Sequence, residues 1–189
     1  GADLPAMRGD SVTALSADQL AAMKAIITKF MATQIPQLNV VELGKLTPAI
    51  FSEFSSAQLA ALNNTQLRAL SADQIARIKA DAVVGLTDSQ LPLLSPTAQL
   101  PGLTTAQLSK LTTAQLPAMT PQQITALSTT QLAAISTGAV KAMTADQVGA
   151  ITTSQMPGMT TAQIAALSSD QFKSLKLSQL RALTDAQVA

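Results

Sequence analysis

Residues 104–135 read TTAQLSKL, TTAQLPAM, TPQQITAL and STTQLAAI, which are four variants of one eight-residue word. We call this word an octad and number its positions one to eight, with Thr104 at position one and Leu111 at position eight. The same frame covers the chain in 24 octads, one of them a residue short (24–30) and one a residue long (95–103). We therefore expect a single repeat domain, 1–189, that forms part of a longer array.

The octad has a fixed pattern of side chains. Position five is apolar in all 24 octads, from Leu4 to Val188, and position eight is apolar in all 23 octads that reach it. Gln is at position four in 17 of 24 octads, and position one is Ser, Thr or Asn in 18 of the 22 octads where it can be assigned. Positions three and seven are commonly small. Such a rule over a whole chain is typical of a repeat protein.

Geometry excludes a continuous helix and a continuous strand. At about 100° per residue, eight residues make about 800°, so an apolar stripe would rotate by about 80° with each octad and face no single core. In a strand, positions five and eight differ by an odd number and would point to opposite faces. The chain must therefore turn within every octad.

The nine prolines indicate where the helical part lies. Each is at position two (Pro48, Pro96, Pro121) or position six (Pro5, Pro36, Pro92, Pro101, Pro117, Pro157). Thr47-Pro48 and Thr120-Pro121 are typical of a helix N-cap followed by Pro at the first helical position. Gln at position four then completes a Ser/Thr-x-x-Gln capping box. Because Pro disfavours helical dihedrals for the residue before it, Pro at position six predicts a helical segment that ends near position five.

Each octad is thus predicted to be one capped helical turn followed by a corner, with its two large apolar side chains in a shared interior. Burying them yields roughly 3 to 6 kcal/mol, whereas ordering eight backbones costs roughly 8 to 16 kcal/mol, so a lone octad cannot fold. Stacked octads share a core, which predicts an all-α solenoid of one-turn helical segments. Small residues at positions three and seven would let coils approach closely. Two, three or four octads per coil all fit the pattern.

Composition excludes several classes of function. The chain has no His, Cys, Trp or Tyr, so no ordinary zinc, haem or copper site, disulfide framework or Ser–His pair can form. Its 12 basic and 11 acidic residues give a net charge of +1, which gives no footprint for nucleic acid. No segment has the roughly 18 apolar residues of a membrane helix, and the start has no signal-peptide pattern. We expect no enzyme activity, no catalytic or metal site, no cofactor and no membrane insertion.

The LTTAQL and ALSADQ words, for example at 103–108 and 14–19, resemble octad arrays in large bacterial surface or secreted repeat proteins that are described as adhesin-like or haem-utilisation proteins. The resemblance covers the whole chain. It implies an extracellular or cell-surface solenoid segment, and it carries no active-site residues. Haem binding gains no support, because Met is the only axial-ligand type present.

Four features could mark a site, and each has a plainer explanation. Arg8-Gly9-Asp10 matches the integrin-binding tripeptide but is a short match in a repetitive chain. Six of seven Met residues are at the predicted core positions five or eight (Met7, Met23, Met119, Met143, Met156, Met159). Asp at position three recurs irregularly, which suits the helix dipole better than calcium (Asp10, Asp18, Asp73, Asp81, Asp146, Asp170). Gln at position four could line a groove, but capping or an amide ladder between coils needs fewer assumptions.

Two features indicate a role. Between Ala82 and Met143 only Asp88, Lys110 and Lys141 are charged, so the surface there suits lateral packing, and neither end has a polar capping octad. The first hypothesis is a non-enzymatic stalk, spacer or fibre-forming segment of a bacterial cell-surface or secreted assembly, with the chain itself as partner. The alternative is an adhesin-type module that presents a Thr/Gln-rich face to a glycan or protein.

Overall fold

The computed structural model describes residues 32–189, and the prediction of a short octad at 24–30 lies outside that part of the chain. Residues 32–189 form short helices joined by corners, with no strand. The elements are η3 (Ala32–Gln37), α2 (Val40–Lys45), η4 (Pro48–Glu53), α3 (Ser56–Ala60), α4 (Asn64–Ala69), α5 (Ala72–Arg77), η5 (Ala80–Gly85), η6 (Leu91–Leu93), η7 (Leu100–Gly102), α6 (Thr105–Ser109), α7 (Gln115–Ala118), α8 (Pro121–Ala126), α9 (Thr129–Ala134), α10 (Thr137–Ala142), α11 (Ala145–Ala150), η8 (Met156–Gly158), α12 (Thr161–Ala165), α13 (Ser169–Lys173), α14 (Leu177–Arg181) and α15 (Asp185–Val188), where η marks a 3-10 helix.

Helix α5 shows the conformation of one octad. Ser71, at position one, is extended with φ −78° and ψ 163°, and positions two to seven are helical. Ile78, at position eight, is again extended with φ −60° and ψ 133°. Positions eight and one therefore make the corner of this octad. The predicted bend is confirmed for the octads within residues 32–189, which form separate short helices.

The predicted capping boxes are present. The Gln74 backbone N–H donates to Ser71 Oγ at 3.2 Å, and the Ser71 backbone N–H donates to Gln74 Oε1 at 2.9 Å. The same reciprocal pair of bonds satisfies two orphan donors of the first turn in many octads. The pairs are Ser55/Gln58, Asn63/Gln66, Ser71/Gln74, Thr104/Gln107, Thr112/Gln115, Thr120/Gln123, Ser128/Gln131, Thr144/Gln147, Thr152/Gln155, Thr160/Gln163 and Ser168/Gln171.

The prediction that Pro at position six ends the helical segment near position five is wrong. The segments at Pro36, Pro92, Pro101, Pro117 and Pro157 all run through the proline, four of them as 3-10 helices. In the octad that holds Pro157, the N–H groups at positions four, five, seven and eight are bonded to carbonyls of the same octad. The octad thus keeps these four bonds although Pro157 has no N–H to donate at position six.

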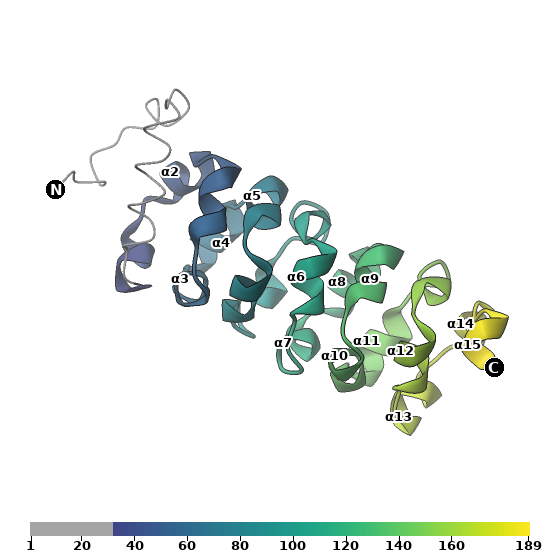
Figure 1. Cartoon of the computed structure of the whole chain (residues 1–189). Helices are drawn as coiled ribbons and strands as arrows, with labels where there is room; N and C mark the ends of the chain where they lie inside the picture. The colour runs from purple at the N-terminus through teal and green to yellow at the C-terminus, as the bar shows by residue number, and fades with distance from the viewer. Residues whose placement is uncertain (1–31) are drawn as a thin grey trace.

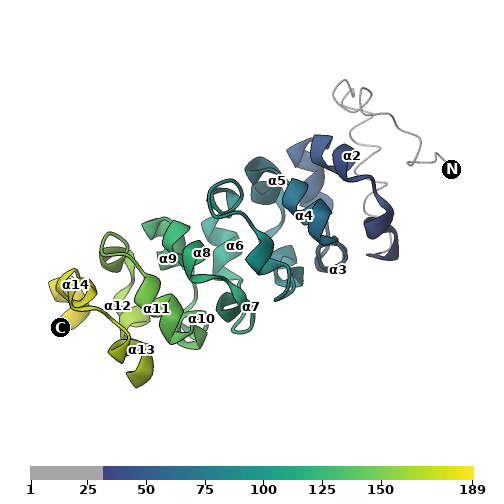
Figure 2. The ribbon, with the colours of Figure 1, turned by 180° about the vertical axis from the view of Figure 1, so that it is seen from behind.

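Two sets of contacts define the size of a coil. Helical segments pack against segments three octads away, as η4 does against α5 and α6 against α9. Hydrogen bonds, in contrast, join octads that are four apart, for example from Gln107 to Ile75. One coil therefore contains between three and four octads. Figures 1 and 2 show the coils as an elongated stack with α2 near one end and α15 at the other.

The long octad 95–103 keeps the register of the stack. Its extra residue lies between the cap and the glutamine, because the Ser95 N–H donates to Gln99 Oε1 at 2.9 Å across four residues instead of three. Gln99 Nε2 still donates to the backbone oxygens of Leu67 and Leu70, at 2.8 Å each. The insertion is absorbed in the first turn and leaves the core positions in phase.

The core is one continuous apolar cluster along the stack. Position five is at most 7% exposed from Ile35 to Ile164, and position eight is buried in most octads, which confirms the prediction for these octads. At Phe172 and Val188, also at position five, the side chain is exposed instead. The irregular residues Ile50, Phe51 and Phe54 are also buried, and the two rings stack with centroids 5.0 Å apart. They are core residues.

Close approach of coils occurs at position seven. A Cβ placed on Gly85 would lie 2.0 Å from the Ser56 oxygen, and one on Gly102 would lie 2.3 Å from the Ala72 oxygen. In both cases position seven meets position two of the octad three before. The same prediction for position three is wrong, since a Cβ on Gly138 meets nothing within 4 Å and position three is on the exposed side of each turn.

Candidate functional site

The glutamine at position four joins two coils. In the octad that begins at Thr104, Gln107 Oε1 accepts from the Thr104 N–H at 2.8 Å. Its Nε2 donates to the backbone oxygens of Ile75 and Ile78, both at 2.7 Å. One side chain therefore caps its own helix and also bonds positions five and eight of the octad four before.

This arrangement repeats along the stack as an amide ladder. The bridging residues are Gln66, Gln74, Gln90, Gln99, Gln107, Gln115, Gln123, Gln131, Gln147, Gln155, Gln163, Gln171, Gln179 and Gln187. The bonds to position-eight oxygens are 2.6–2.9 Å long, and all of these glutamines except Gln187 are buried. Buried amides that meet three backbone groups satisfy nearly all of their own hydrogen-bonding capacity.

Sequence reasoning raised the amide ladder only as one of several explanations, although the sequence holds a signal for it. Glu completes a capping box as well as Gln does. Position four nevertheless carries Gln in 17 octads and Glu only at Glu42. Only the amide has an NH₂ group to donate to another coil, so the near-absence of Glu indicates that the donor is required.

The ladder is interrupted where position four is apolar. Ile50, Ala82 and Ala139 are buried at this position and cannot donate. Ala82 is four octads after the pair Phe51 and Phe54, and Ala139 is four octads after the pair Leu108 and Leu111. At these rungs no position-four amide joins the two coils, and the residues belong to the apolar core.

The methionines and the position-three aspartates that lie within residues 32–189 are part of the core and of the first helical turns. Met119, Met143, Met156 and Met159 are buried, which confirms their assignment to the core, whereas Met7 and Met23 lie outside the described residues. Asp73, Asp81, Asp146 and Asp170 are in the first turns of their helices, as predicted, and Asp10 and Asp18 lie outside the described part. Arg8-Gly9-Asp10 also precedes residue 32. Within 32–189 no three carboxylates cluster as a metal site would require.

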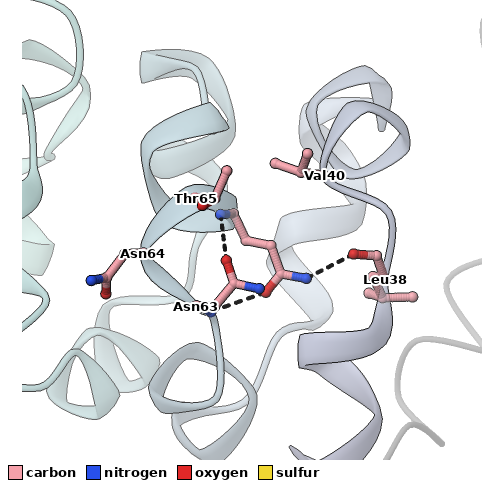
Figure 3. Close-up of a pocket in the computed structure, with 6 residues that line it drawn as sticks. Leu38, Val40, Asn63, Asn64 and Thr65 are labelled. Atoms are coloured by element: carbon pink, nitrogen blue, oxygen red, sulfur yellow. Dashed lines mark hydrogen bonds between the residues drawn. The ribbon is translucent and has the colours of Figure 1, made fainter.

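A depression of about 620 Å³ lies between the corner at Leu38 and Val40 and the first turn of α4 (Figure 3). Asn63 and Gln66 line it, but their polar atoms already bond each other, and Gln66 also donates to the Leu38 oxygen at 2.9 Å. The lining residues include no titratable side chain. The depression is thus a corner between coils, and its lining offers no titratable group for acid–base chemistry.

The proposed Thr/Gln-rich face exists only in part. The bridging glutamines from Gln66 to Gln179 point inward and are buried. The exposed positions one to three carry mostly Thr, Ser, Ala and Asp. A groove lined by position-four amides is therefore excluded for these octads, and nothing in the described residues favours a glycan site.

Charged residues form a few ion pairs across coils. Lys110 Nζ lies 2.8 Å from Asp81 Oδ1, and Lys79 Nζ lies 3.9 Å from Glu53 Oε2. Both lysine side chains are more than half exposed, so each pair contributes at most about 1 kcal/mol. Stability between coils therefore comes mainly from the core and the amide ladder.

The residues described so far define a class of protein, an all-helical octad solenoid whose repeated polar group is structural. Comparison with protein families agrees, because the ALTTAQ repeat matches residues 96–129 and 126–161. A comparison with curated proteins gives no match. Among residues 32–189, no helix is long and apolar enough to cross a membrane.

Proposed function

We propose that the chain is a non-enzymatic structural spacer of a bacterial cell-surface or secreted assembly. The observation that supports this role most directly is the amide ladder. The position-four glutamine is the most regular polar residue of the sequence, and its side chain is fully used in hydrogen bonds that join one coil to the next. A spacer needs a defined length and stiffness, and needs no reactive side chain. Repeat proteins of this kind lengthen by adding units, each of which contacts only its near neighbours.

Small-angle X-ray scattering tests the mechanical part of this proposal. The protein should scatter as an elongated particle, and a variant that lacks residues 104–159, which are seven octads, should be shorter by two coils with an unchanged cross-section. A compact particle would contradict a spacer. Electron microscopy over a concentration series tests whether the chain alone forms fibres. Fibres that lengthen with concentration would make the chain a fibre-forming unit, whereas monomers at every concentration would restrict it to a spacer.

The location is tested separately. Antibodies against the protein should label intact cells of the source bacterium, or should detect the protein in its culture medium. Labelling that appears only after the cells are lysed would contradict a surface or secreted role, and would leave the solenoid structure unaffected.

A further inference from the structure

Asn63 begins the one stretch of the chain in which Asn is followed two residues later by Ser or Thr. The chain has three asparagines, Asn39, Asn63 and Asn64, and only Asn63 meets this condition, through Thr65. The residue between them is not Pro, so the stretch matches the acceptor sequence for N-linked glycans in secreted proteins. Such a stretch can be modified only where the amide nitrogen is accessible.

The structure leaves the amide nitrogen of Asn63 accessible. Asn63, Asn64 and Thr65 are all exposed, at the corner before α4 and in its first turn. Asn63 Oδ1 accepts from the Gln66 N–H at 2.9 Å, and the Asn63 backbone N–H donates to Gln66 Oε1 at 3.0 Å. These bonds do not use Asn63 Nδ2, and within residues 32–189 no group accepts a hydrogen bond from it or from the Thr65 hydroxyl.

The amide of Asn63 differs from the caps of most other octads. At Ser71 and Thr120 a hydroxyl oxygen is the cap acceptor. Asn supplies an equivalent acceptor and adds an NH₂ group that the cap does not need. The depression between the first turn of α4 and the corner at Leu38 and Val40 adjoins this side chain and leaves open space beside it (Figure 3). A substituent on Nδ2 therefore has room and does not compete with the cap.

We propose that Asn63 is the acceptor of an N-linked glycan, an assignment that rests on the proposed surface or secreted location. A glycosyltransferase of the cell joins Asn63 Nδ2 to the anomeric carbon of a sugar that is activated as a diphosphate ester. The bond between that carbon and the diphosphate oxygen breaks, the diphosphate leaves with its electron pair, and Nδ2 gives up one of its two protons. Oδ1 still accepts from the Gln66 N–H, so α4 keeps its cap.

Glycopeptide mapping tests the proposal. The protein is isolated from a whole culture of the source bacterium, cells and medium together, and its peptides are fragmented by electron-transfer dissociation. The expected result is a peptide in which Asn63 carries the mass of one or more sugar units. An unmodified Asn63, or sugar attached to Thr65 instead, would overturn the proposal wherever the protein is found. Antibody labelling of intact cells is a separate measurement, so a surface protein without the glycan contradicts only this proposal, and a glycan on a protein inside the cell contradicts only the location.

Variants expressed in the same bacterium separate the acceptor sequence from the fold. Asn63→Ser keeps a cap residue and removes the amide. Asn64→Pro places proline at position two, where Pro121 already begins a helix, and Asn63 is already extended, with φ −75° and ψ 166°, as the residue before proline prefers. Proline between Asn and Thr blocks glycan transfer. Both variants should lose the sugar completely and keep their far-UV circular dichroism, whereas Thr65→Ser should keep the sugar. Sugar that persists on Asn64→Pro would overturn the proposal.

Discussion

The Nε2 atom of Gln123 donates to the backbone oxygen of Leu94 at 2.7 Å, across 29 residues of sequence. The same side chain accepts from the Thr120 N–H at 2.8 Å and donates to the Leu91 oxygen at 2.8 Å. It is 1% exposed. Its neighbour Gln122, at position three, is exposed and makes no such bridge. Adjacent residues of one type thus have separate roles, set only by their position in the octad.

Gln123→Ala should lower the free energy of unfolding by about 3 kcal/mol, because it removes three hydrogen bonds, two of them to buried carbonyl oxygens. Gln122→Ala is the matched control and should change it by less than about 0.5 kcal/mol. Urea unfolding followed by far-UV circular dichroism measures both values. Similar losses in the two variants would show that the bridge contributes nothing specific.

Gln123→Glu should add a pH dependence to the free energy of unfolding. Burial beside two carbonyl oxygens raises the pKa of the introduced carboxyl above its usual value of about 4.3. The protonated acid can donate to one carbonyl, so the variant is most stable below about pH 4 and loses stability as pH rises through the raised pKa. The difference in unfolding free energy between variant and parent, measured from pH 4 to 8, should grow with pH. A constant difference would mean that the side chain leaves the interior.

The sequence predicts the local structure of this fold well. Capping residues such as Thr120, the glutamine three residues on and the apolar positions act within one octad, so their effects are visible in eight letters. The octad of Pro157 is an exception. The preference of a residue before proline for extended backbone predicts that the helical segment ends at Met156, whereas the 3-10 turn Met156–Gly158 runs through the proline. Local patterns can indicate helical turns without indicating how each one ends.

The size of the coil could not be predicted, because the octad pattern is the same whichever earlier octad lies beneath. It depends on contacts between residues far apart in sequence, such as Gly102 with Ala72 and Gln107 with Ile75. The first contact spans three octads and the second spans four. The interior bridge was not predicted from capping, which accounts only for the Oε1 atom of each glutamine. The one signal for a second role of Nε2 is the near-absence of Glu at position four.

Gly102→Ala tests the close approach of coils. The new Cβ would lie 2.3 Å from the Ala72 oxygen, which is backbone and cannot rotate away, so the coils must separate. The expected loss is about 2 kcal/mol of unfolding free energy. Gly138→Ala is the control, since its Cβ meets nothing within 4 Å inside α10, and it should gain about 0.5–1 kcal/mol from helix propensity. Thermal unfolding measures the melting temperature of both variants. Equal shifts in melting temperature would contradict a close contact between coils at position seven.

Thr47→Val should stabilise the protein, although Thr47 precedes a helical segment as a cap residue does. Its Oγ1 is buried without a hydrogen-bond partner and makes no cap bond to η4, in which position four is Ile50. Removing an unsatisfied buried hydroxyl should gain about 1 kcal/mol. Thr120→Val removes a working cap and should lose about 1 kcal/mol. Opposite signs in urea unfolding are expected, and a loss in both variants would mean that Thr47 has a partner.

Ala139→Gln should repair the ladder. Ser136, three residues earlier, already accepts from the Ala139 N–H at 3.2 Å, so the cap half of the box is in place. An amide at this position would face the backbone oxygens of Leu108 and Leu111, four octads before. Gln131 and Gln147, at the neighbouring rungs, donate to the corresponding oxygens of their own partner octads. The two new bonds between coils should raise the unfolding free energy by about 1–2 kcal/mol. Hydrogen exchange should show greater protection at residues 104–111 and 136–143 and little change beyond residue 160. A loss of stability would show that the interior at Ala139 has no room for a glutamine, and that this rung is held by apolar packing instead.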